Sequence, residues 1–196
     1  MISGIILASG LSRRMGEDKL LLPVAGVPVI ERVIAAASKS DLEEVILVYG
    51  NDIVYNIGKK FRIKAVKNNT PQLGQSYSIR LGVKNSCRAA EGLMFLVGDQ
   101  PYITENIINK LIKSFMSEKC SAAVPLYNGT KGNPVIFSSK LREKLMGLSG
   151  DSGGRVLLEE MEGSVITVSF DDPKPGLDID TREEYEAIIR LEDRNG

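Results

Sequence analysis

The sequence predicts a single doubly wound α/β domain with a mostly parallel, mixed sheet, and three observations lead to this prediction. Short apolar runs alternate along the chain with segments that have helical spacing. The apolar runs are nearly continuous rather than alternating, as in strands that are buried on both faces. The 196 residues contain no repeat, low-complexity tract or linker. We therefore expect residues 1–196 to form one domain.

The predicted elements follow one another in strand–helix order. Strands are expected at residues 2–7, 44–50, 62–68, 93–97 and 164–170, and helices near 29–37, 53–60, 76–85, 107–115, 139–146, 154–161 and 185–191. Two further apolar runs, SAAVPLY and NPVIFS, flank the turn-forming segment NGTKG. This arrangement predicts a β-hairpin, which we expect to form an antiparallel edge of the sheet.

The composition excludes several classes of protein. Lys plus Arg and Asp plus Glu number 25 each, so no net charge draws the chain toward nucleic acid or a membrane surface. The chain has no histidine, which excludes Ser-His-Asp and Cys-His catalysis and disfavours a zinc site. Cys87 and Cys120 lack C-x-x-C spacing. With no apolar run of membrane-spanning length, these features predict a cytoplasmic protein.

Two loops are the expected location of the chemistry. Ligands of a doubly wound sheet bind beyond the carboxyl ends of the strands, near the point where the strand order reverses. The loops that begin at Ala8 and at Gly98 follow the first and the fourth predicted strand. We therefore expect the functional residues to lie in these loops.

The loop after Leu7 reads A-S-G-L-S-R-R-M-G-E-D-K. It lacks the spacing of a P-loop, which needs a lysine directly after the second glycine, and it contains no G-x-G-x-x-G. Its glycines would still let backbone N–H groups approach phosphate oxygens, and Arg13, Arg14 and Lys19 could neutralise a triphosphate. The alternative is a solvated turn with incidental basic residues.

Acidic residues follow two other predicted elements. Asp99 comes directly after a buried strand, where a carboxylate suits Mg²⁺; it could instead cap the next helix, although Thr104 also suits that role. Asp178 and Asp180 would point the same way in an extended segment. Thr181 and Glu184, however, form a capping-box pattern for the last helix, so Asp180 could equally belong to a helix start.

Six segments resemble the MobA-like nucleotidyltransferases in family order. The first, LASGLSRRMGEDKLLLPVAGVPVI, is similar to the family signature L-A-x-G-x-S-x-R-M-G-x-x-K. The others are NNTPQLGQSYSIRLG, LVGDQPYIT, GNPVIF, GDSGGR and DIDT. The resemblance is closest to molybdenum cofactor cytidylyltransferases and implies a Rossmann-like nucleotidyltransferase fold.

The resemblance also implies a role for individual residues. Lys19, Arg14 and Asp99 would be catalytic, and Asp99 with Asp180, favoured over Asp178, would bind Mg²⁺. The nucleotide would be bound by Leu7, Ala8, Ser9, Gly10, Ser12, Arg13, Gly16, Asn69, Gly74 and Ser78, and the acceptor by Asn133, Gly153 and Arg155. Local alternatives are that Gln75 or Ser76 caps one helix and that Asp151 or Ser152 caps another.

Three positions depart from the family pattern. Family members that use GTP typically read L-A-G-G and those that use CTP read L-A-A-G, whereas this chain has Ser9 at the third position. A side chain there narrows the base pocket and favours a pyrimidine by analogy. Asn133 replaces the usual histidine of G-H-P, and Leu73 stands where the family often has an aromatic residue.

The implied activity is transfer of CMP from CTP to the terminal phosphate of molybdopterin, the molybdenum cofactor, with release of pyrophosphate. No general base is needed, because a phosphate nucleophile is already ionised at neutral pH. Alternatives are the GTP-using guanylyltransferase, a nucleotidyltransferase acting on a sugar phosphate or alcohol phosphate, and a non-catalytic cofactor carrier. The implied partners are CTP or another NTP, molybdopterin and a molybdenum hydroxylase that receives the product.

Overall fold

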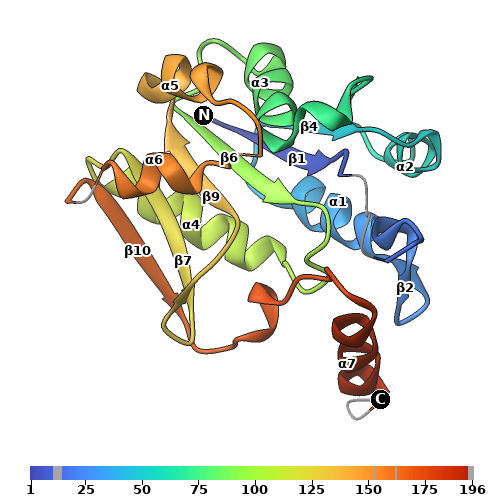
Figure 1. The fold of residues 1–196 in the computed structure, drawn as a ribbon. Coiled ribbons are helices and arrows are strands. Elements are labelled where there is room, and N and C mark those ends of the chain that lie inside the picture. Colours follow the sequence, from blue (N-terminus) through green and yellow to red (C-terminus); the bar gives the residue numbers. More distant parts are fainter. Residues whose placement is uncertain (11–14, 152, 162, 194–196) are drawn as a thin grey trace.

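The computed structural model describes residues 1–10, 15–151, 153–161 and 163–193. Within them, an eight-stranded mixed sheet has the order β10-β7-β9-β6-β1-β4-β5, with β8 beside β7 (Figure 1). Its strands are β1 (Ile2–Ala8), β4 (Glu44–Tyr49), β5 (Lys64–Lys67), β6 (Gly92–Val97), β7 (Ala122–Tyr127), β8 (Thr130–Lys131), β9 (Val135–Ser138) and β10 (Val165–Phe170). The doubly wound α/β fold predicted from the apolar runs is confirmed.

The hairpin lies elsewhere in the sheet than predicted. Strand β9 runs antiparallel between β6 and β7, and the short β8 pairs with the end of β7. The edges of the sheet are β5 and β10, and β10 pairs with β7 in parallel. The prediction of an antiparallel edge was therefore wrong: the second hairpin strand is buried, with Ile136 and Phe137 almost fully covered.

Helices cover both faces of the sheet (Figure 1). The helices are α1 (Val29–Lys39), α2 (Asp52–Gly58), α3 (Gln75–Asn85), α4 (Glu105–Ser117), α5 (Arg142–Gly147), α6 (Arg155–Glu159) and α7 (Arg182–Asp193). One apolar core joins α1, α2 and α4 to Ile2 and Ile6 of β1. The other joins α3, α5 and α6 to Ile5 of the same strand. Successive residues of β1 thus point into opposite cores, which explains its unbroken apolar sequence.

The strand order reverses at β1. The chain passes from β1 to β4 and β5 on one side and then returns to place β6 on the other side of β1. Leu7 of β1 lies opposite Val97 of β6, so both strands end at the same height. The two loops predicted to carry the chemistry, after Ala8 and after Val97, therefore leave the sheet side by side.

Helix α7 fixes the end of the chain near these loops. It packs with the two-stranded ribbon of β2 (Pro23–Val24) and β3 (Val27–Pro28) in a third apolar cluster that includes Ile179. The Ile179 N–H donates to the Asp99 carbonyl over 3.2 Å. This bond brings residues 178–180 beside the end of β6.

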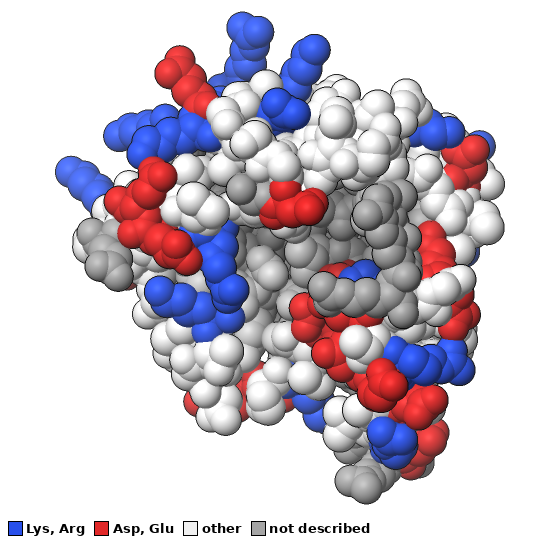
Figure 2. All heavy atoms as spheres, viewed as in Figure 1, with Lys and Arg blue, Asp and Glu red and all other residues white. Residues whose placement is uncertain are grey.

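Charge is distributed in the way that the composition suggests. Basic and acidic side chains alternate over the face shown in Figure 2, without one sign covering it. Among the described residues, no helix has both the length and the apolar character that a membrane crossing requires.

Candidate active site

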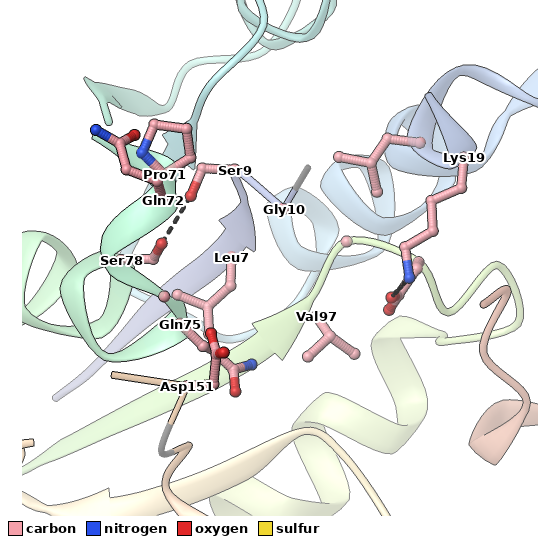
Figure 3. A pocket seen from close by; sticks show the side chains of 14 residues that line it. Leu7, Ser9, Gly10, Lys19, Pro71, Gln72, Gln75, Ser78, Val97 and Asp151 are labelled. Carbon is pink, nitrogen blue, oxygen red and sulfur yellow. Dashed lines mark hydrogen bonds and ion pairs between the residues drawn. The ribbon is translucent and has the colours of Figure 1, made fainter. Parts of the chain in front are cut away.

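A cavity of about 370 Å³ opens at the carboxyl ends of β1 and β6. Figure 3 shows Ser9 and Ser78 on one side of it and Lys19 on the opposite side. Its walls come from the two strand ends, from the turn before α3 and from Asp151: Leu7, Ser9, Gly10, Lys19, Leu20, Pro71, Gln72, Gly74, Gln75, Ser78, Val97, Gly98, Asp99 and Asp151. We call this space the first cavity.

A buried polar network forms one end of the first cavity. The Ser9 and Ser78 hydroxyl oxygens lie 2.7 Å apart, and Asn68 Nδ2 donates to them over 3.0 and 3.1 Å. All three side chains are buried, with at most 6% of each residue exposed. The network joins the end of β1, the end of β5 and the first turn of α3, so it ties together three segments distant in sequence.

The network has one hydrogen-bond donor left for a ligand. Two hydroxyl groups carry two protons, and one of these protons makes the bond between Ser9 and Ser78. Asn68 supplies donors to both oxygens and accepts from the Thr70 N–H through Oδ1. Among the described residues, the second hydroxyl proton has no acceptor, so this end of the cavity is suited to an acceptor atom of a ligand.

The turn before α3 depends on Gly74. Its φ of +84° is in the left-handed region, and a Cβ there would lie 2.4 Å from the Gly150 carbonyl oxygen. Gly74 is also the N-cap of α3, and no side chain caps this helix. The suggestion that Gln75 or Ser76 caps it was therefore wrong. Instead, the Ser76 N–H donates to the Gly150 carbonyl and holds the 150–154 loop against the cavity.

The opposite end of the first cavity is charged. Lys19 Nζ lies 2.6 Å from Asp99 Oδ2 and 2.6 Å from Asp180 Oδ1. The Lys19 and Asp99 side chains are 14% and 18% exposed, so water screens this contact less than it screens a surface ion pair. Burial acts to lower the pKa of Lys19, but the two carboxylates outweigh burial and the pKa is raised. Lys19 is therefore a permanent cation.

Local structure positions both partners of this contact. Lys19 begins a 3-10 turn (Lys19–Leu21) whose N-cap is Asp18: one carboxylate oxygen of Asp18 accepts from the Leu20 N–H. The other oxygen, Oδ2, accepts from Asn51 Nδ2 over 2.8 Å. Next to Asp180, Glu184 accepts from the Thr181 N–H and Thr181 Oγ1 accepts from the Glu184 N–H. The capping box is thus formed by Thr181 and Glu184, which leaves the Asp180 carboxylate to contact Lys19. The capping interpretation is thus confirmed for Thr181 and Glu184, and the metal-ligand role of Asp180 stays a prediction.

The carboxylates fit a divalent cation. Asp99 Oδ1 is buried and has no hydrogen-bond partner among the described residues, although the same side chain contacts Lys19 through Oδ2. Oxygen ligands of this kind suit Mg²⁺, which usually takes one or two carboxylates and completes its shell with water and substrate phosphates. The described residues contain no group of three or more acidic or sulfur ligands around a common point. Asp99 and Asp180 could therefore hold the ion together with a phosphate-bearing substrate.

A second cavity of about 620 Å³ adjoins the first and shares Leu7, Gln75 and Val97 with it. Its floor is apolar, formed by side chains such as Ile79, Phe95, Val124, Val135 and Phe137. Apart from the shared Gln75, its polar lining consists of Gln100, Lys131, Asn133, Arg155, Glu159 and Asp178. Loss of surrounding water, and then the Asp99 carboxylate, raise the pKa of Asp178, although this residue remains exposed at the cavity wall.

Most of the predicted site residues meet at these two cavities. Leu7, Ser9, Gly10, Lys19, Gly74, Ser78 and Asp99 line the first cavity, and Asn133, Gly153 and Arg155 line the second. Asp180 reaches the charged end through Lys19. Ala8 is buried in β1, and Gly16 has a φ of +70° in the loop but is not a lining residue. Ser12, Arg13 and Arg14 lie outside the described residues.

Two expectations about neighbouring residues do not match the structure. Asn69 is exposed and does not line the first cavity, whereas Asn68, which sequence reasoning missed, belongs to the buried network. Asn68 directly follows β5, and this position at a strand end was a signal for the neighbourhood of the site, although it did not distinguish Asn68 from Asn69. Asp151 does not cap α6, whose N-cap is Gly154 without a side-chain bond; Ser152 lies outside the described residues.

Two known proteins are similar to this chain along nearly its whole length. Purine catabolism protein PucB of Bacillus subtilis is 31% identical over 198 residues, covering 95% of each chain. The molybdenum cofactor guanylyltransferase of Rhodobacter capsulatus is 28% identical, covering 98% of this chain and 96% of its own.

Solved structures share the fold. A Mycobacterium sp. strain JC1 homologue of a Mycobacterium tuberculosis protein has a TM-score of 0.85 at 26% identity, covering 100% of this chain and 98% of that one. The Mycobacterium tuberculosis protein itself, solved in complex with manganese, has a TM-score of 0.74 at 22% identity, covering 96% of this chain and 98% of its own.

The family model for the MobA-like NTP transferase domain matches residues 4–165. This range includes both strand-end loops, Lys19, Asp99 and the buried polar network. The chain belongs to the MobA-like NTP transferase family, and this membership supports nucleotidyltransferase activity.

Proposed function

We propose that this protein transfers CMP from CTP to the terminal phosphate of molybdopterin, the molybdenum cofactor, and releases pyrophosphate. The observation that carries the proposal is the Lys19 nitrogen held between the Asp99 and Asp180 carboxylates, on the wall of a cavity that adjoins a second one. A nucleotide and an acceptor bound in adjacent cavities would meet beside this charged cluster. A carrier of finished cofactor would have no use for such a cluster.

The proposed reaction requires the two substrates to be positioned and the charge of the triphosphate to be neutralised. A phosphate oxygen of the acceptor attacks the α-phosphorus of the nucleotide; a new P–O bond forms, the bond to the β-phosphate oxygen breaks, and pyrophosphate carries away the electron pair. Lys19 neutralises the triphosphate, and the arginine of the R-M-G motif, Arg14, is proposed to assist it. Asp99 and Asp180 would hold Mg²⁺, which supplies further charge stabilisation when it is bound.

The buried polar network supports a pyrimidine in the first cavity. Ser9 is 6% exposed, and its side chain fills space at the end of β1 that a glycine would leave open. The spare hydroxyl proton of the Ser9–Ser78 pair suits the O2 or N3 acceptor of cytosine. GTP is the second candidate, because the Rhodobacter capsulatus relative is named as a guanylyltransferase.

The second cavity supports a heterocyclic phosphate as acceptor rather than a sugar phosphate. Its apolar floor suits a flat ring, whereas a sugar would need hydroxyl partners along its whole length. Lys131 and Arg155 would bind the acceptor phosphate. Asn133 would take the place of the family's histidine, and its amide group does not titrate. A molybdenum hydroxylase that receives the product remains part of the proposal.

The decisive experiment measures pyrophosphate release with CTP, GTP, ATP and UTP, each with Mg²⁺ or Mn²⁺ and with or without molybdopterin. We expect release that requires both molybdopterin and metal and is fastest with CTP. Asp99→Asn should lower it at least roughly a hundredfold while the far-UV circular dichroism stays unchanged. Asp52→Asn, at a surface ion pair with Lys67, is the matched control. If none of the four nucleotides gives pyrophosphate release under any of these conditions, the transferase proposal is rejected.

A further inference from the structure

The side chain of Tyr127 connects two segments that line the second cavity. It ends β7 and is 3% exposed, although its own atoms do not line the cavity. Its hydroxyl group donates to the Asn133 carbonyl over 2.7 Å. Burial raises the pKa of this phenol above its ordinary value, so the group remains a donor at any physiological pH.

Two glycines pack against the same ring. A Cβ on Gly132 would lie 2.8 Å from the Tyr127 ring, and a Cβ on Gly176 would lie equally close to it. Neither glycine has a positive φ that would itself demand glycine. The absence of a side chain at both positions is therefore explained by close packing on Tyr127.

These contacts come from two segments that are distant in sequence and both line the second cavity. Gly132 lies between Lys131 and Asn133, and all three line the cavity. Gly176 also lines it and begins the segment that continues to Asp178, another lining residue, and to Asp180, which contacts Lys19. A shift of the ring would thus move the acceptor wall and the carboxylate segment together.

We infer that Tyr127 is a positioning residue that sets the shape of the acceptor cavity and aligns it with the carboxylates. The inference about the acceptor rests on the proposed function. Tyr127 contacts neither cavity directly, so it acts through Asn133 on one side and through Gly176 on the other. The expected consequence is weaker acceptor binding with nucleotide binding unchanged.

The test compares Tyr127→Phe, which keeps the ring and removes the hydroxyl, with Tyr127→Leu, which removes the ring. Tyr185→Phe is the matched control, because the Tyr185 hydroxyl also donates to a backbone carbonyl, that of Pro23, over 2.8 Å, away from both cavities. Hydrogen–deuterium exchange of the full chain is measured for peptides covering residues 130–134, 174–180 and 68–78. For Tyr127→Phe we expect faster exchange in 130–134, and for Tyr127→Leu faster exchange in 130–134 and 174–180 together, with 68–78 unchanged.

The kinetic arm measures KM for molybdopterin, kcat and the Kd of the metal–nucleotide. Tyr127→Phe should raise KM for molybdopterin roughly fivefold, the effect of one lost hydrogen bond, with kcat and nucleotide Kd unchanged. An unchanged KM, or an equal loss of nucleotide affinity, would overturn the inference. If the wild type transfers no nucleotide, the proposed function fails, and the exchange data alone decide the positioning role. The role is rejected if Tyr127→Leu speeds hydrogen–deuterium exchange in only one of the segments 130–134 and 174–180, or in neither.

Discussion

Lys19 and Asp180 are 161 residues apart in the chain, yet Lys19 Nζ lies 2.6 Å from Asp180 Oδ1. The same nitrogen contacts Asp99, so one cation joins the first loop, the end of β6 and the segment before α7. Without that cation, the two carboxylates would repel each other. Lys19 therefore neutralises the two carboxylates that are proposed to hold a divalent ion.

Lys19→Met should strengthen metal binding while it abolishes transferase turnover. With the competing cation removed, we expect Mn²⁺ alone to bind roughly tenfold more tightly than it binds the wild type, while transferase turnover is lost. Isothermal titration with MnCl₂ measures the affinity. Lys60→Met, at an exposed pair with Glu31, should change neither property. Equal or weaker Mn²⁺ binding by Lys19→Met would show that lysine and metal do not compete.

Asn68→Ala should weaken nucleotide binding. The substitution removes the donor shared by the Ser9 and Ser78 hydroxyls and leaves two buried oxygens short of a partner, so we expect Kd for the preferred nucleotide to rise roughly tenfold or more. Equilibrium dialysis measures this. Asn69→Ala is the matched control, because the neighbouring side chain is exposed and outside the cavity. Equal effects of the two substitutions would remove the network from base recognition.

Ser9→Gly should relax discrimination between CTP and GTP. Removing the side chain opens space at the end of β1, so we expect kcat/KM for GTP to rise relative to CTP. Ser9→Ala keeps Cβ but removes the hydroxyl group, and it should lower CTP use without admitting GTP. Competition assays with both nucleotides give the ratio directly. A ratio unchanged in both variants would place base selection elsewhere.

Asp178→Asn should stabilise the fold at neutral pH. The pKa of Asp178 is raised in the folded protein above its ordinary 3.8, so the ionised carboxylate destabilises the folded state once the pH exceeds the folded pKa. The penalty disappears below 3.8, where the group is protonated in both states. Thermal unfolding should therefore show a higher Tm for the variant at neutral pH and a shrinking difference as the solution is acidified. A constant difference would contradict this linkage.

The sequence predicted the position of the site better than its details. Unbroken apolar runs identify β1 and β6. Because ligands of a doubly wound sheet bind at the carboxyl ends of its strands, these runs predict a site at the loops after Ala8 and Val97. The choice between Asn68 and Asn69 was beyond this reasoning, because a shift of one residue at the end of a strand reverses the direction of the side chain. The residue type is the same at both positions and gave no help.

Long-range pairing was the other limit. The hairpin pattern specified that residues 121–127 and 133–138 approach each other, but not that β9 would insert beside β6. Pairing between strands distant in sequence depends on the packing of both sheet faces, which no local pattern records. For the same reason, the contact of Lys19 with Asp180 could be found only from the structure. The two acidic residues at 178 and 180 could be identified from the sequence.

The family model ends at residue 165, whereas Asp180 and Gly176 lie beyond that boundary. A chain shortened to the range of the family model would keep both strand-end loops, yet it would lose one carboxylate, one contact of Tyr127 and nearly all of the edge strand β10. The range of the family model is thus shorter than the length of chain that brings Asp180 to Lys19, whereas the named relatives match nearly the whole chain. The proposed chemistry therefore needs residues on both sides of the boundary of that family model.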